Sequence, residues 1–297
     1  MQRLDVQFLS GGSRCDAWLY LPESKHPAPI IVMAHGLGST RSMGLDNYAQ
    51  RFSMLGYACL VFDYRHFGGS EGEPRQLLDV NKQLQDWKAA VAFARTRSDV
   101  NTNKVILWGT SFSGGHVIAT AADDQKISAV ISQCPFTDGM ASSMAVPPLT
   151  SMKVTARALR DKIGSWLGTA PVTIALAGKP GTTAMMSAPD CEDGYLNLVP
   201  ESEAKRFPNY VAARIALQIL TYFPGRKTPN LNCPVLFCVC ETDTVAPAKA
   251  TLRHARRAPQ GEIKRYNEGH FDIYTGTAFE RAIGDQIDFL QRAVPLS

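Results

Sequence analysis

One segment carries most of the structural information in this chain: Val105-Ile106-Leu107-Trp108-Gly109-Thr110-Ser111-Phe112-Ser113-Gly114-Gly115-His116. It begins as an apolar run typical of a buried strand and ends in small residues before a helical segment, His116–Ala122. A strand that turns sharply into a helix can hold a serine hydroxyl at the turn, in what is called a nucleophile elbow. The residues two before and two after the serine must then be small, and here they are Gly109 and Ser113. On its own, the pattern fits both a nucleophile at Ser111 and an ordinary strand-to-helix loop rich in glycine and serine.

Strands and helices alternate on both sides of this segment. The chain opens with two extended segments joined at Gly11-Gly12, which is a hairpin signal. Alternation of this kind predicts an α/β fold with a mostly parallel central sheet and helices on both faces. The expected strands are Arg3–Leu9, Cys15–Leu21, Ile30–Ala34, Tyr57–Asp63, Ile127–Ser132, Pro234–Cys240 and Ile263–Tyr266, and the expected helices are Leu45–Leu55, Val80–Thr96, Pro247–Arg257 and Ala278–Ala293.

The alternation is interrupted after Pro135. From there to Pro229 no segment has the quality of a buried strand, and two helical patches stand out, Met152–Leu167 and Pro208–Tyr222. We therefore predict a helical cap inserted into the core. The predicted division is a first part of the core in residues 1–136, the cap in residues 137–230, and a second part of the core in residues 231–297.

Reactive residues in open parallel sheets gather at the carboxyl ends of the strands. Ser111 follows one predicted strand, Asp243 follows the strand after the cap, and His270 follows the last short strand. A serine hydroxyl needs a base to accept its proton and an anion to orient that base. The order serine, aspartate, histidine is the order expected when this fold contains a catalytic triad. We predict Ser111 as nucleophile, His270 as base and Asp243 as its partner.

Asp138 is the main rival for the acidic role, because it also follows a predicted strand. Glu268 and Asp272 are too close to His270 along the chain to reach the far ring nitrogen. Among the other histidines, we expect a structural role for His35 and an exposed helical position for His254.

The tetrahedral intermediate of acyl transfer also needs donors for its oxyanion. The Phe112 amide, at the start of a helix, is one candidate donor. The Leu37 amide, in a loop where Gly36 and Gly38 permit an unusual backbone, is the second. In a further loop at a strand end, Asp63 and Arg65 are expected to form charge-assisted hydrogen bonds that fix the loop.

These motifs resemble those of the α/β-hydrolase superfamily over the whole chain apart from the cap. The resemblance implies the fold and a serine mechanism, with Ser111, Asp243 and His270 as triad and Leu37 and Phe112 as oxyanion donors. Its last motif is similar to a subgroup of esterases, dienelactone-hydrolase-like proteins and fungal polyketide thiohydrolases or transferases. The motifs are His35-Gly36-Leu37-Gly38, Asp63–Ser70, the Ser111 elbow, Asp243 with Pro247, and Gly269-His270-Phe271-Asp272-Ile273-Tyr274.

The composition of the chain argues against several other classes of function. The chain has 297 residues and a net charge of +4, without a basic cluster interleaved with aromatic residues, which argues against nucleic acid as a partner. No apolar run is long enough to span a membrane, and the N-terminus lacks the apolar core of a signal peptide. Seven scattered cysteines, an odd number, favour reduced thiols and a cytoplasmic location. We expect no metal and no organic cofactor.

The leading hypothesis is a serine esterase that cleaves a small carboxylic ester or thioester through an acyl-enzyme. The alternatives are an acyltransferase or thioesterase of a biosynthetic, polyketide-type pathway, a peptidase, and a binding protein without catalysis.

The cap should supply an apolar pocket, with its helical residues packed on the core and its methionines as candidate lining residues. The sequence is compatible with a homodimer. Those methionines are Met140, Met144, Met152, Met185 and Met186.

Overall fold

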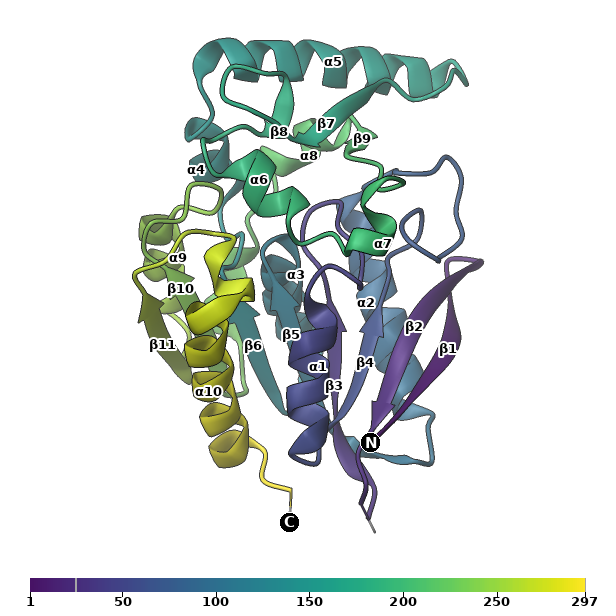
Figure 1. Cartoon of the computed structure of the whole chain (residues 1–297), viewed down its shortest axis with the longest axis vertical. Helices are drawn as coiled ribbons and strands as arrows, with labels where there is room; N and C mark the ends of the chain where they lie inside the picture. Colours follow the sequence, from purple (N-terminus) through teal and green to yellow (C-terminus); the bar gives the residue numbers. More distant parts are fainter. Residues whose placement is uncertain (25, 297) are drawn as a thin grey trace.

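The computed structural model describes residues 1–24 and 26–296 and contains a central sheet of eight strands, in the order β1-β2-β4-β3-β5-β6-β10-β11 (Figure 1). The edge strand β1 pairs antiparallel with β2, and β2 pairs antiparallel with β4. Every further pair, from β4 to β11, is parallel. This architecture confirms the α/β fold with a mostly parallel sheet that the alternation of strands and helices predicts, and it agrees with the fold that the family resemblance implies.

The elements of the core lie within a few residues of their predicted positions. The largest differences are in β5, which begins at Val100 rather than at Val105, and in α3, which begins immediately after Ser111 rather than at His116. The strands are β1 (Gln2–Ser10), β2 (Ser13–Leu21), β3 (Ala28–Ala34), β4 (Ala58–Phe62), β5 (Val100–Thr110), β6 (Ala129–Gln133), β10 (Val235–Cys240) and β11 (Gly261–Tyr266), and the helices are α1 (Leu45–Met54), α2 (Val80–Arg95), α3 (Phe112–Asp123), α9 (Ala248–Ala255) and α10 (Gly276–Ala293), with short 3-10 turns η1 (Pro224–Asn230) and η2 (Asp272–Tyr274).

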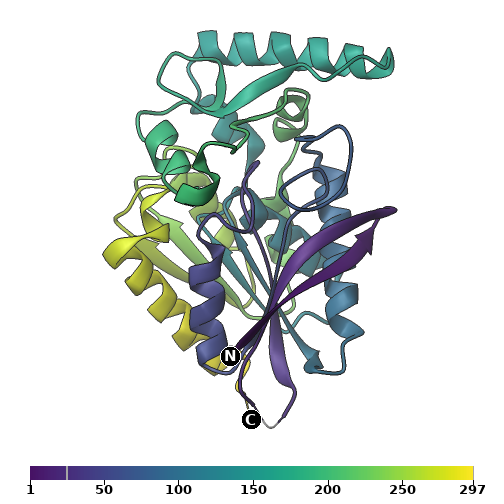
Figure 2. The ribbon, with the colours of Figure 1, turned by 45° about the vertical axis from the view of Figure 1, so that its right-hand side comes forward.

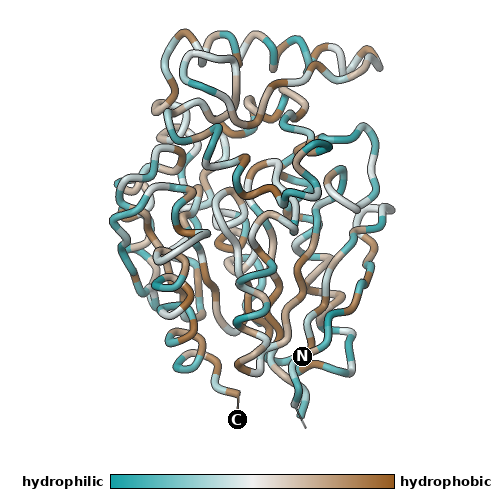
Figure 3. Tube along the Cα trace, viewed as in Figure 1, coloured by the Kyte–Doolittle hydropathy of each residue, from teal (hydrophilic) through white to brown (hydrophobic). Residues whose placement is uncertain are grey.

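Helices cover both faces of the sheet, and the strands are apolar on both sides for that reason. Along β3, Ile30 and Val32 join the core beneath α2 and α3, whereas Ile31 and Met33 join the core beneath α1 and α10. Figure 1 shows α1 and α10 in front of the sheet with α2 and α3 behind it. The hydropathy colouring of Figure 3 shows these central strands mainly as apolar.

A buried ion pair ties the loop after β4 to α2. Arg65 Nε lies 2.5 Å from Asp86 Oδ1, and the two side chains are 4% and 0% exposed. The Arg65 amide also donates to Asp86 Oδ2, at 3.0 Å. Arg65 thus fixes the loop by charge-assisted hydrogen bonds, as expected, and Asp86 is the acceptor. Asp63 accepts hydrogen bonds from the amide and the guanidinium of Arg41.

Removing the acid from this pair is expected to destabilise the protein strongly. Asp86→Ala leaves the Arg65 charge buried without its partner, which should lower the free energy of unfolding by about 3–5 kcal/mol. The matched control is Asp124→Ala, since Asp124 pairs with Arg95 at 2.6 Å but both side chains are 27% exposed. That partly exposed pair should contribute no more than about 1 kcal/mol. Urea unfolding of both variants measures the difference, and equal losses would refute the argument.

The segment between β6 and β10 forms a cap over the carboxyl ends of the strands (Figures 1 and 2). It is not purely helical, because it contains a second sheet of three strands in the order β8-β7-β9. The helix predicted for Pro208–Tyr222 is wrong in its first half, where β9 pairs with β7. The division of the chain at residues 136 and 230 stays a prediction. The cap elements are α4 (Gly139–Met144), α5 (Pro148–Trp166), β7 (Thr173–Ala177), β8 (Ala184–Met186), α6 (Cys191–Leu196), α7 (Glu201–Ala204), β9 (Tyr210–Ala212) and α8 (Ile215–Ile219).

The outer side of the cap is formed by α5, and several of its apolar side chains do not pack as expected. Leu159, Ile163, Trp166 and Leu167 are exposed, and only the opposite side of the helix, with Val154 and Ala158, is buried. Both chain ends lie at the far end of the molecule from this helix (Figures 1 and 2). Over residues 1–24 and 26–296, no helix has the length and apolarity needed to cross a membrane.

Candidate active site

Three side chains from separate strand ends meet beneath the cap. Ser111 follows β5, Asp243 follows β10 and His270 follows β11. The Nε2 atom of His270 lies 2.9 Å from Ser111 Oγ, and its Nδ1 atom lies 2.6 Å from Asp243 Oδ2. His270 is 2% exposed and Ser111 is 7% exposed. Both ring nitrogens are thus occupied in the way a base needs, with a hydroxyl on one side and a carboxylate on the other.

The backbone at Ser111 has the unusual geometry of the predicted elbow. Its φ of 56° and ψ of −119° lie in a region that costs a non-glycine residue about 1–3 kcal/mol. A side chain at Gly109 would collide with the Ser113 backbone and with Val117, at about 2.7–2.8 Å, so the turn requires a glycine there. The strand therefore leads directly into α3, which explains why the helix starts earlier than its sequence pattern suggested.

The carboxylate of Asp243 is held in place by its own loop. Its Oδ1 atom accepts hydrogen bonds from the amides of Val245 and Ala246, at 2.8 and 2.6 Å. Oδ2 is left to accept from His270. This division of the two oxygens fixes the carboxylate orientation and, through it, the imidazole ring.

The rival acid Asp138 has different partners. Its carboxylate caps α4 by accepting from the Ala141 amide and pairs with Arg253 at 2.6 Å. His254 lies 3.5 Å from the same oxygen and is buried, so the expectation that His254 is exposed is wrong. Burial alone would raise the pKa of Asp138, but the hydrogen bonds from Ala141 and His254 and the charge of Arg253 bring it below its usual value. Asp138 thus belongs to a structural cluster.

The loop that contains Leu37 lies against the nucleophile. A side chain at Gly36 would come within 2.9 Å of Ser111 Cβ and 3.1 Å of Ser111 Oγ. The Leu37 amide has no hydrogen-bond acceptor among the residues the structure describes. Phe112 is the first residue of α3, so its amide has no acceptor within the helix. Neither predicted oxyanion donor therefore has a hydrogen-bond acceptor among the described residues.

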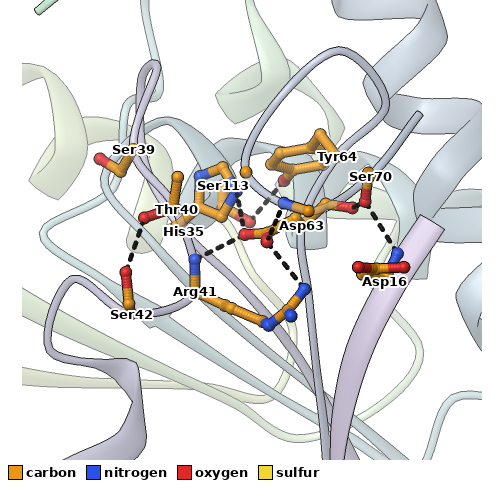
Figure 4. Close-up of polar contacts among 12 residues, drawn as sticks. Asp16, His35, Ser39, Thr40, Arg41, Ser42, Asp63, Tyr64, Ser70 and Ser113 are labelled. Carbon is orange, nitrogen blue, oxygen red and sulfur yellow. Dashed lines mark hydrogen bonds and ion pairs between the residues drawn. The ribbon is translucent and has the colours of Figure 1, made fainter. Parts of the chain in front are cut away.

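A network of hydrogen bonds around Tyr64 contacts the elbow at Ser113 (Figure 4), and sequence reasoning missed most of it. The Tyr64 hydroxyl donates to Ser113 Oγ at 2.9 Å and accepts from Trp87 Nε1 at 2.8 Å. Serine is tolerated at position 113, where this motif usually has glycine, because its hydroxyl has a partner. The one signal for this network in the sequence is that Tyr64 directly follows Asp63 at the end of β4.

The two other histidines near the site are held neutral by burial. Burial lowers the pKa of His35 to about 3, and its Nδ1–H donates to the Gly36 carbonyl at 3.1 Å. Burial likewise lowers the pKa of His116 to about 3. His116 bonds to Tyr222 and Gln83, at 2.7 and 2.9 Å. Neither ring contacts Ser111 through a hydrogen bond, which agrees with a structural role for both.

A cavity of about 310 Å³ opens above Ser111 between the cap and the core. Its lining is mainly apolar, with several hydroxyl groups, and contains no acidic or basic side chain among the described residues. Two of the five candidate methionines, Met185 and Met186, line it, whereas Met140, Met144 and Met152 are exposed. Within the described ranges, no group of three His, Cys, Asp or Glu side chains is arranged to hold a metal ion.

Comparison with known proteins agrees with the fold. The quorum-quenching protein AidA of Acinetobacter baumannii (strain MDR-ZJ06) is 59% identical over 293 residues, which covers 99% of this chain and 96% of AidA. The thiohydrolase aneE of Aspergillus aculeatus is 26% identical, covering 97% of this chain and 92% of its own. The crystal structure of the α/β hydrolase GrgF from Penicillium sp. sh18 superposes with a TM-score of 0.82 at 24% identity and covers 99% of both chains. Residues 25–275 match the family described as "Serine aminopeptidase, S33", and the chain therefore belongs to this family of α/β hydrolases.

Proposed function

We propose that this protein hydrolyses an uncharged carboxylic ester or thioester through an acyl-enzyme on Ser111. The observation that carries the proposal is the chain of contacts from Ser111 through His270 to Asp243, at 2.9 and 2.6 Å, at the base of an uncharged cavity. A solvent-shielded serine gains nucleophilic character from such a base, and the carboxylate stabilises the imidazolium that forms.

The reaction then follows from the positions of these groups. Ser111 Oγ attacks the substrate carbonyl carbon as its proton passes to His270 Nε2. The amides of Leu37 and Phe112 bind the oxyanion, and each donor of this kind typically contributes about 3 kcal/mol to the transition state. The alcohol or thiol leaves with the proton from His270. Water then attacks the acyl-enzyme with His270 again as base, which releases the acid and restores Ser111.

The cavity lining supports a neutral acyl group. Burial of an unpaired charge is costly, and the described lining offers no side chain of opposite charge. The same argument disfavours an aminopeptidase, whose substrate carries an ammonium group. Because two relatives are a quorum-quenching protein and a thiohydrolase, we include acyl lactones and thioesters among the candidate substrates. Transfer of the acyl group to another acceptor is the second candidate, supported by the polyketide transferase grgF, 26% identical over 98% of this chain.

A matched substrate panel tests the proposal. The substrates are p-nitrophenyl butyrate, its analogue with a terminal carboxylate, a butyryl thioester, an N-acyl homoserine lactone and an aminoacyl p-nitroanilide. We expect turnover of neutral esters and thioesters, and at least about tenfold lower kcat/KM for the charged analogue. Preference for the anilide would indicate a peptidase and contradict the proposal. Formation of a new ester when an alcohol acceptor is added, in place of the free acid, would favour transfer.

Two further expectations concern the protein in the cell. We propose a cytoplasmic location, supported by seven cysteines that are all buried as free thiols in the described structure. We also propose that the protein forms a homodimer through the exposed apolar residues of α5, such as Leu159, Ile163 and Trp166. Sedimentation of the wild-type protein and of Trp166→Ser tests this proposal, and an unchanged dimer in the variant would refute it.

A further inference from the structure

Cap residues contact the backbone of the loop that contains Leu37. Tyr195, on α6, is buried, and its hydroxyl donates to the Leu37 carbonyl oxygen at 3.0 Å. The same hydroxyl accepts a hydrogen bond from Ser39 Oγ at 3.4 Å. A side chain from the cap is thus bonded directly to the residue whose amide is the candidate oxyanion donor.

A second cap residue confines this loop from another direction. Gly38 has a φ of 65°, and the space that a side chain would need there is filled by Leu176 of β7. On the other side, Gly36 lies against Ser111. The loop is therefore held between the nucleophile and the cap. Neither Tyr195 nor Leu176 is among the residues that line the substrate cavity.

The helix that bears Tyr195 also touches the loops of the other two site residues. Thr244, the neighbour of Asp243, donates from its hydroxyl to Asp190 at the start of α6, at 2.8 Å. The ring of Phe271, the neighbour of His270, packs so closely on Gly194 that a side chain at position 194 would come within 2.6 Å of it. One short helix thus contacts all three loops around Ser111.

We propose that Tyr195 is a positioning residue for the oxyanion hole and that α6 makes the cap part of the catalytic machinery. The inference rests on the proposed function. Glycine on both sides of Leu37 leaves the loop free to rotate, and the hydrogen bond from Tyr195 fixes the Leu37 carbonyl. Because the carbonyl and the amide of Leu37 belong to one short loop, this contact also restricts the rotation of the Leu37 amide. Donors that are already in place stabilise the transition state without reorganisation.

Tyr195→Phe tests the inference, because it removes the hydroxyl and keeps the ring. We expect kcat for p-nitrophenyl butyrate to fall about tenfold while KM changes less than about twofold, since the lost interaction matters mainly in the transition state. A trifluoromethyl ketone that adds to Ser111 forms an oxyanion, so its affinity should fall by the same factor as kcat/KM. The matched control is Tyr210→Phe, which alters a half-exposed tyrosine on β9 of the same cap.

The outcomes separate this inference from the proposed function. If Tyr195→Phe keeps wild-type kcat and ketone affinity, the inference is wrong, whatever Ser111→Ala does. If Ser111→Ala still turns over the ester, the proposed function fails first. A raised KM with unchanged ketone affinity would indicate that Tyr195 acts in substrate binding, and this result would also contradict the inference. If Tyr195→Phe does not fold, as judged by its thermal midpoint, Leu176→Ala frees the Gly38 side of the loop and should give the same fall in kcat at constant KM.

Discussion

Ser111→Ala is expected to lower kcat for p-nitrophenyl butyrate by about 10⁵- to 10⁶-fold, because the remaining groups can then only bind and polarise the substrate. The fold should persist. The Oγ atom has one hydrogen-bond partner, His270 Nε2, among the residues described, so little stability is lost with it. Steady-state kinetics and thermal unfolding on the same preparation measure both effects.

The nearest matched control is Ser113→Ala, two residues along the same elbow. Its hydroxyl bonds to Tyr64 rather than to His270, so this variant should lose about 1 kcal/mol of stability and keep kcat within about tenfold. The serine mechanism is refuted if a folded Ser111→Ala protein keeps a tenth or more of the wild-type rate.

The second large effect is expected for Asp243→Asn, with kcat lowered by about 10³- to 10⁴-fold. An amide side chain can hold His270 in the wrong tautomer, and it lacks the negative charge that stabilises the imidazolium. One oxygen would still accept from the Val245 and Ala246 amides, as Oδ1 does in the wild type, so the loop should keep its shape.

The matched control here is Asp138→Asn, which changes the rival carboxylate in the same way. Asp138 pairs with Arg253 and caps α4, so this variant should lose some stability and keep kcat within about twofold. Kinetics of both variants on one ester distinguish the two acids. The opposite pattern, with Asp138→Asn inactive and Asp243→Asn active, would transfer the acidic role to Asp138.

The parts of the fold that could be predicted are those fixed by local patterns. Doubly covered strands are apolar along the covered length, so β3, β4, β10 and the second half of β5 were recognisable. The meeting of Ser111, Asp243 and His270 could be expected because parallel strands end at one edge of the sheet. Small residues at 109 and 113 indicated the elbow, since their signal lies within five positions of the chain.

The parts of the fold and of the site that could not be predicted depend on contacts between segments far apart in the sequence. The partner of Arg65 is Asp86 on α2, which the loop sequence does not reveal. The strands of the cap are short, three to five residues, and carry too little periodicity to be distinguished from loops. Tyr195 lies on a helix of six residues, and its link to Leu37 spans 158 positions. The exposed apolar residues of α5 have the same spacing as core residues, which is why packing was expected for them.

The central claim is that Ser111 is the nucleophile, and covalent labelling tests it most directly. A fluorophosphonate requires an activated serine hydroxyl, and peptide mass spectrometry locates the label. We predict one label per chain, on the peptide that contains Ser111, with loss of esterase activity in proportion to labelling and no label on Ser111→Ala. Full labelling of Ser111 with undiminished activity, or loss of activity with Ser111 unlabelled, would contradict the account.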